Sequence, residues 1–102
     1  MHTCLEEHQP RVIALCTKYQ AERLYAFGSA VGGGFDVDKS DFDFLVRFFP
    51  CTPEEHADRY FGLLESLEAL LETKVDLVEI DAIKNPYFRQ EVEATRILLY
   101  AA

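Results

Sequence analysis

The alternation of residue types in residues 41–49 constrains the fold of this 102-residue chain more than any other feature. The odd positions begin with Asp41 and Asp43, whereas the even positions are all apolar: Phe42, Phe44, Val46 and Phe48. Because successive side chains of a strand point to opposite faces, this segment is expected to be a strand with one face packed on helices. The two aspartates then share the other face, about 6.6 Å apart along the strand.

Two carboxylates at this spacing indicate metal-assisted phosphoryl chemistry. They can share a pair of divalent ions, which stand about 3.5–4 Å apart in two-metal sites. Asp76 lies near the start of another apolar segment, residues 75–80, as its second residue. If the two segments pair as strands, Asp41, Asp43 and Asp76 converge at one sheet edge. Such hard oxygen ligands suit Mg²⁺, which completes its shell with water and substrate oxygens.

The remaining patterns predict an α/β (α+β) fold, a small mixed β-sheet covered by helices. A helix is expected over residues 7–19, with Pro10 in its first turn, and a strand over 22–27. Thr52, Pro53 and Glu55 form the start signal of a second helix, which is expected to end at Thr73-Lys74. Asn85 and Pro86 begin a short third helix, and residues 97–100 form the last strand. The order is α-β-loop-β-α-β-α-β, and we expect one domain over residues 1–102.

Net charge limits the partners of the chain. Ten Lys and Arg stand against eighteen Asp and Glu, a net charge of −8. Direct binding to duplex nucleic acid is not expected, because such binding depends on Lys and Arg that neutralise phosphates. Three cysteines with no metal-site or CxxC spacing, and no signal-like or membrane-spanning run, favour a cytoplasmic location without a membrane partner.

The segment between the first two strands adds a candidate phosphate site. Gly28 and Ser29 end the first strand, and their small side chains and backbone N–H groups could approach phosphate oxygens closely. Gly32-Gly33-Gly34 follows in a polar loop. No Gly-Lys-Ser/Thr comes after it, so it is not a P-loop.

These motifs together resemble the minimal nucleotidyltransferase (MNT) family, which shares the core fold of DNA polymerase beta. The resemblance is carried by three segments, Phe27-Gly28-Ser29, Ser40-Asp41-Phe42-Asp43-Phe44-Leu45-Val46 and Val75-Asp76-Leu77-Val78, and by the tail from Asn85 to Tyr100. It covers nearly the whole chain.

The resemblance implies transfer of a nucleoside monophosphate, with AMP the expected group, from a nucleoside triphosphate to an acceptor hydroxyl. It implies that Asp41 and Asp43 hold two Mg²⁺ ions and that Asp76 binds the metal that activates the acceptor. Gly28 and Ser29 would grip the triphosphate. Members of the family are commonly paired with a HEPN-domain protein, for which they act as antitoxins, so a HEPN-type partner and ATP are expected.

The chain departs from the family pattern just after Gly28-Ser29. Family members usually carry one or two arginines there, and this chain has Ala30 and Gly32. Lys39, at the far end of the loop, is the candidate substitute for nucleotide binding. The departure leaves an alternative open, in which a catalytically degraded antitoxin neutralises its partner by binding alone. The oligomeric state and the acceptor are also open, and a substrate polymer such as tRNA is a weaker option for so small and acidic a domain.

The acidic residues also have simpler explanations. Asp41 and Asp43 could be solvated edge charges that discourage aggregation of the sheet. Asp36, Asp38 and Ser40 suggest a calcium loop, but Asp41 and Arg47 stand where an EF-hand needs Gly and Glu. The set Gly28-Ser29, Asp41, Asp43 and Asp76 therefore favours the metal site.

Overall fold

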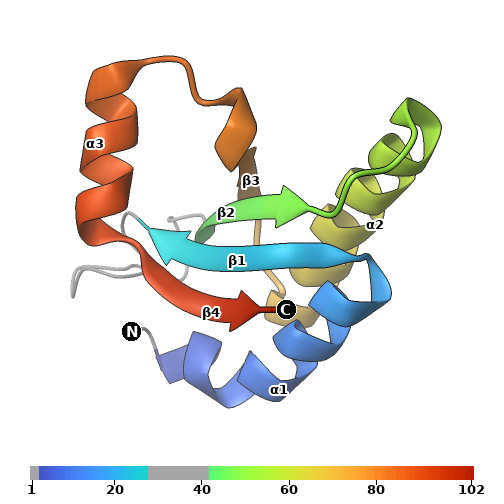
Figure 1. The fold of residues 1–102 in the computed structure, drawn as a ribbon. Helices are drawn as coiled ribbons and strands as arrows, with labels where there is room; N and C mark the ends of the chain where they lie inside the picture. Colours follow the sequence, from blue (N-terminus) through green and yellow to red (C-terminus); the bar gives the residue numbers. More distant parts are fainter. Residues whose placement is uncertain (1–2, 28–41) are drawn as a thin grey trace.

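A computed structural model describes residues 3–27 and 42–102, with side chains described from Glu7 onward (Figure 1). The elements are α1 (Thr3–Lys18), β1 (Ala21–Phe27), β2 (Phe42–Phe48), α2 (Pro53–Leu71), β3 (Val75–Glu79), the 3₁₀ turn η2 (Ile80–Ala82), α3 (Pro86–Thr95) and β4 (Ile97–Ala101). The predicted α/β fold class and the predicted order of helices and strands are confirmed, and η2 is an addition to them. None of the helices described is long and apolar enough to cross a membrane.

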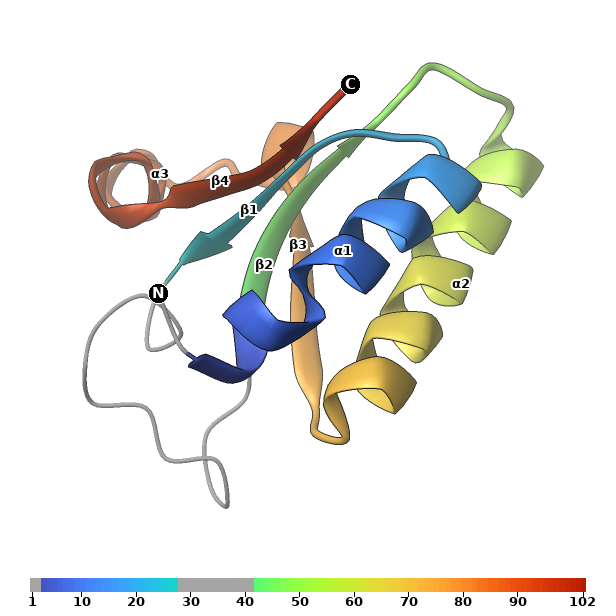
Figure 2. The ribbon, with the colours of Figure 1, turned by 90° about the horizontal axis from the view of Figure 1, so that it is seen from below.

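The four strands form one mixed sheet in the order β3-β2-β1-β4. β1 pairs antiparallel with both β2 and β4, whereas β2 and β3 are parallel. A parallel pair requires a crossover connection, and here α2 supplies it. Figure 2 shows β3 beside β2, with α1 and α2 together on one side of the sheet.

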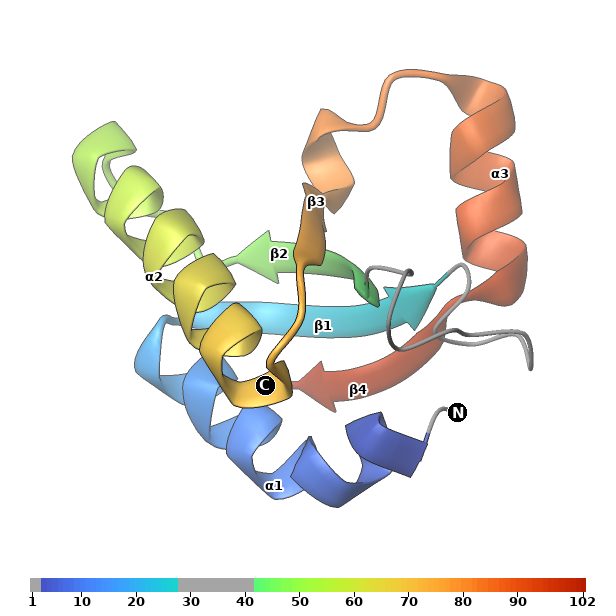
Figure 3. The same cartoon turned by 180° about the vertical axis from the view of Figure 1, so that it is seen from behind.

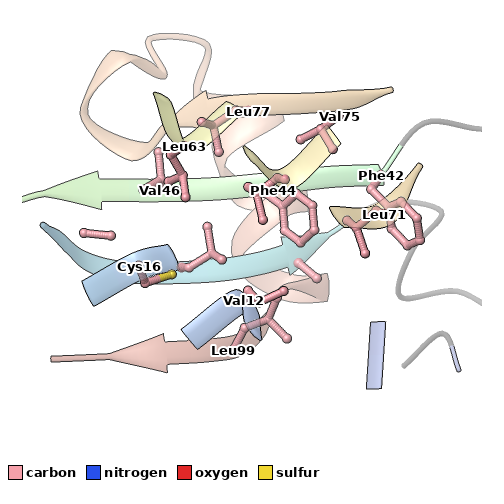
Figure 4. Packing of buried hydrophobic residues seen from close by; sticks show 14 residues of the cluster. Val12, Cys16, Phe42, Phe44, Val46, Leu63, Leu71, Val75, Leu77 and Leu99 are labelled. Carbon is pink, nitrogen blue, oxygen red and sulfur yellow. The ribbon is translucent and has the colours of Figure 1, made fainter. Parts of the chain in front are cut away.

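The larger core lies between the sheet and the pair α1 and α2. Phe42, Phe44 and Val46 of β2 are almost completely buried there, as the alternation in the sequence predicts. They pack with Val12 and Cys16 of α1 and with residues of α2, β3 and β4 (Figure 4), which include Leu63, Leu71, Val75, Leu77 and Leu99. This core holds β2 with its odd-numbered residues turned to the opposite face.

A smaller apolar cluster covers that opposite face. It joins Tyr25, Phe27, Leu45, Ile80 and Val92, with Val78 and Ile83 packed against it. Figure 3 shows α3 and η2 on this side of the sheet, away from α1 and α2. The sheet therefore has apolar packing on both faces.

The starts of two helices follow the predicted signals. The Thr52 side chain accepts a hydrogen bond from the backbone N–H of Glu55, and Glu55 accepts one from the backbone N–H of Thr52. This is the predicted capping box, with Pro53 in the first turn. Asn85 caps α3 in the same manner, accepting from the N–H groups of Tyr87 and Phe88.

Several predicted boundaries were wrong by a few residues. α1 begins at Thr3 rather than near residue 7, so Pro10 lies inside the helix and not in its first turn. Proline removes a helical hydrogen bond at such a position, and burial of Val12 and Cys16 in the following turns offsets that local cost. α2 ends at Leu71, before Thr73-Lys74, because Glu72 adopts the left-handed conformation with φ 54°.

The strand boundaries differ less. β3 stops at Glu79 because Ile80 enters the 3₁₀ turn, and β4 extends to Ala101. β2 covers Phe42–Phe48. Asp41, the first residue of the predicted strand, lies outside the described residues.

Candidate functional site

Asp43 of β2 and Asp76 of β3 are register partners across the parallel pair of strands. Neighbouring strands lie about 4.8 Å apart, so two carboxylates stand side by side. Asp43 is half-buried and Asp76 is exposed. The sequence predicted that these two acids converge if the strands pair, and that pairing is now established.

The two carboxylates project from the face opposite the large core. The flanking register pairs, Phe42 with Val75 and Phe44 with Leu77, all belong to the core under α1 and α2. Side chains alternate across a strand, so Asp43 and Asp76 must point to the other face. That face is otherwise apolar beside them, because Leu45 and Val78 form the next register pair and belong to the smaller cluster.

Two side chains of α2 fix β3 on either side of Asp76. Glu68 accepts a hydrogen bond from the backbone N–H of Val75 at 3.2 Å, and the Tyr60 hydroxyl donates to the backbone C=O of Leu77 at 2.6 Å. The backbone of β3 is therefore anchored one residue before and one residue after the aspartate. Burial, with smaller contributions from the negative charges of Glu79 and Asp76, raises the pKa of Tyr60, so its hydroxyl remains a donor near neutral pH.

The chemistry of the pair fits a divalent cation in part. Carboxylate oxygens are the ligands that Mg²⁺ prefers, and Mg²⁺ is usually held by one or two carboxylates together with water and substrate phosphates. Within residues 3–27 and 42–102, no group of three or more His, Cys, Asp or Glu could hold a metal ion. Asp43 and Asp76 therefore provide two carboxylates and not a complete protein cage.

The other predicted site residues cannot be placed. Gly28, Ser29, Lys39 and Asp41 lie outside the described residues. Two of them are nonetheless sequence neighbours of the described site. Gly28 follows Phe27, the register partner of Asp43 in β1, and Asp41 precedes Phe42.

Sequence reasoning missed the two residues that position Asp76. Neither Tyr60 nor Glu68 was singled out as a candidate site residue. Helical spacing predicts which face of α2 is buried, but it carries no signal for contacts with a strand that follows seven or more residues later.

With the geometry established, comparison with known proteins decides the family. The family model for the nucleotidyltransferase domain matches residues 13–99. The chain belongs to the nucleotidyltransferase domain family. The match spans β1, β2, β3, α2 and α3 in full and the first part of β4, so it includes both aspartates.

Individual relatives of this nucleotidyltransferase domain agree. A protein of Methanocaldococcus jannaschii named "putative protein adenylyltransferase" is 41% identical over 76 residues, which are 74% of each chain. A solved structure of a minimal nucleotidyltransferase is 33% identical, with TM-score 0.71, over 91% of this chain and 90% of that one.

A third relative shows the likeness in fold alone. A complex of the tri-AMPylated HEPN toxin of Shewanella oneidensis with its MNT antitoxin matches with TM-score 0.66 and 20% identity, over 95% of this chain and 72% of that one. The expected resemblance to minimal nucleotidyltransferases is therefore confirmed.

Proposed function

We propose that this domain is a Mg²⁺-dependent nucleotidyltransferase that transfers AMP from ATP to a hydroxyl group of a HEPN-type partner protein, with release of pyrophosphate and the hydroxyl proton, and so acts as an antitoxin. The observation that carries the proposal is the register pairing of Asp43 with Asp76 on one face of the sheet. Asp41, the sequence neighbour of Phe42, completes the proposed carboxylate set.

The proposed roles follow from the chemistry of each residue. Asp41, Asp43 and Asp76 would hold Mg²⁺, and Asp76 would also take part in activating the acceptor hydroxyl. Gly28, Ser29 and Lys39 would bind the triphosphate through backbone N–H groups and one ammonium group. The metal, when bound, supplies positive charge that offsets the charge of the phosphates in a chain with net charge −8.

The choice of nucleotide and acceptor rests on the relatives. The name of the M. jannaschii relative supports an adenylyl group and a protein acceptor. The AMPylated HEPN toxin bound to an MNT antitoxin supports a HEPN-type partner. For this chain, the adenylyl group, the protein acceptor and the HEPN-type partner are our proposal.

Mass spectrometry of the partner after incubation with ATP, Mg²⁺ and this protein tests the reaction. The account predicts an added AMP group with wild type and none with Asp43→Asn or Asp76→Asn. Asp58→Asn is the matched control, because Asp58 is an exposed acid of α2 and its substitution changes the charge equally. Equal transfer by the wild type and the Asp76→Asn variant would refute the assigned role.

A second candidate, neutralisation by binding alone, is favoured by Ala30 and Gly32, which stand where the family usually has arginine. Arginine contacts phosphate through two parallel hydrogen bonds, and these are lost here. Co-expression with the partner separates the two functions. Rescue by the Asp43→Asn, Asp76→Asn double variant supports binding alone, whereas loss of rescue with the partner still bound supports catalysis.

A further inference from the structure

The face of the sheet that carries Asp43 and Asp76 holds a second polar site at some distance from them. A pocket of about 260 Å³ lies between β1, β2, η2 and α3, with Tyr25 and Ile80 among its walls. Figure 3 shows α3 and η2 on the same side of the sheet, which agrees with a pocket lined by residues of both. Its charged lining residues are Arg23, Arg47, Arg89, Arg96, Glu22 and Glu93. We call it the arginine pocket.

The charge of the arginine pocket opposes that of the chain. Four of the ten basic residues gather here against two glutamates, whereas the whole chain has net charge −8. Arg23 and Arg47 are register partners of β1 and β2, and Arg89 and Arg96 are two turns apart on α3 and its C-cap, so packing of α3 against the sheet brings the two pairs together. Positive charges that repel one another are brought together by the fold itself.

The donors of the pocket outnumber its internal acceptors. Arg47 is paired with Asp81 at 2.9 Å, and Arg89 with Glu93 at 3.1 Å. Arg23 and Arg96 have no carboxylate partner among the described residues. The Nε atom of Arg47 is covered from solvent and has no hydrogen-bond partner within that same part of the chain.

The guanidinium of Arg96 is held in place by an aromatic ring. Its Cζ atom lies over the ring of Tyr25, 4.4 Å from the ring centre. A cation–π contact uses no N–H···O hydrogen bond, so the N–H groups of Arg96 can still make the parallel hydrogen bonds that arginine makes to carboxylate or phosphate. Arg96 is half-buried and is therefore more fixed than a fully solvated arginine.

We propose that the arginine pocket binds a small oxyanion, a phosphate monoester or a dicarboxylate, with Arg23 and Arg96 as the principal donors. Its size admits one or two anionic groups, and the net charge of the chain disfavours a polyanionic polymer. Arg47 lies four residues beyond Asp43 on β2, about 13 Å along the strand, so the pocket is separate from the carboxylate pair. The inference does not depend on the proposed transfer reaction.

Nuclear magnetic resonance titration of the full chain in EDTA tests this site. Inorganic phosphate and succinate are added separately while the arginine Nε–H and backbone amide signals are followed. We expect saturable shifts centred on Arg23 and Arg96, and the anion that produces them identifies the ligand class. Shifts that never saturate with either anion would overturn the proposal.

Variants separate specific donors from general charge. Arg23→Gln with Arg96→Gln should weaken binding about tenfold. Arg11→Gln with Lys84→Gln removes the same charge from exposed sites outside the pocket and should leave the affinity within about twofold. Because loss of the Tyr25 contact could loosen the fold, Arg23→Gln alone is a second variant, for which we expect weakening at full thermal stability. Equal weakening in the matched control would contradict the proposal.

Discussion

Asp43 and Asp76 face each other across the only parallel strand pair in the described part of the sheet, and Glu68 and Tyr60 of α2 anchor the backbone on both sides of Asp76. Like charges placed opposite each other in a sheet are destabilising. A cation bound between the two carboxylates would offset their mutual repulsion.

The first prediction concerns stability with and without metal. Asp76→Asn should stabilise the metal-free protein by roughly 0.2–1 kcal/mol, because one of two facing charges is removed. The same variant should lose the Mg²⁺-dependent increase in melting temperature that the wild type shows. Thermal denaturation in EDTA and in MgCl₂ measures both effects.

Asp58→Asn controls for overall charge in that experiment. This exposed residue lies on helix α2 and is not part of the sheet. Its substitution should therefore leave the Mg²⁺ response intact. A wild-type protein that gains no stability from Mg²⁺, alone or with ATP, would argue against a metal site at this edge.

The second prediction concerns the capping box of α2. Thr52→Ala removes the acceptor for the Glu55 N–H and should reduce the free energy of unfolding by about 1 kcal/mol. Glu55→Gln retains an acceptor oxygen for the Thr52 N–H and should cost much less. Urea denaturation measures both. No loss in Thr52→Ala together with a clear loss in Glu55→Gln would show that charge at the helix start, and not the reciprocal hydrogen bonds, provides the stability.

The third prediction concerns the contact between α1 and α2. A Cβ at Gly62 would overlap the ring of Tyr19, whose hydroxyl also lies 3.2 Å from the hydroxyl of Ser66. Gly62→Ala should therefore destabilise the protein by about 1 kcal/mol, since overpacking outweighs the gain in helix propensity.

The same substitution should change sign when the ring is absent. In a Tyr19→Ala background, Gly62→Ala should stabilise the protein by up to about 1 kcal/mol, because only the gain in helix propensity remains. Chemical denaturation of the four proteins completes the cycle. Additive effects would mean that the two residues do not touch in solution.

The fourth prediction concerns alkaline pH. Burial raises the pKa of the Cys16 thiol from 9.0 to about 12. Between these two pH values the folded state keeps a thiol proton that the unfolded state loses. The free energy of unfolding is therefore unaffected by ionisation of Cys16 below pH 9 and decreases as the pH rises from 9 toward about 12. The free energy of unfolding of the wild type should fall over that range more steeply than that of Cys16→Ala.

Thiol labelling offers an independent check of the same burial. Cys51 is partly exposed and should react with an alkylating reagent in the native protein, whereas Cys16 should react only after unfolding. Rapid native labelling of Cys16 would contradict the packing of α1 on the sheet.

Local signals in the sequence predicted those parts of the fold that local physics determines. The alternation around Phe44 predicted which face of β2 is buried, and Thr52, Glu55 and Asn85 predicted two helix starts. Pro10 misled the prediction, because packing of the later turns of α1 keeps the helix intact through it.

The candidate site was predictable only in part. Asp43 and Asp76 were predicted as partners because each lies near the start of an apolar strand. The anchors of Asp76 and the arginine pocket were not, since they depend on contacts between elements that are distant in sequence. Arg23 and Arg96, for example, are 73 positions apart, and no short-range pattern links them.

The most direct test of the central claim is the position of a bound metal ion. Mn²⁺ added to isotope-labelled protein broadens the amide signals of residues near it. The account predicts broadening that is strongest at Asp43 and Asp76 and weaker at Arg47, about 13 Å along β2, and loss of the effect in Asp43→Asn with Asp76→Asn. Broadening centred elsewhere, or unchanged in the double variant, would contradict it.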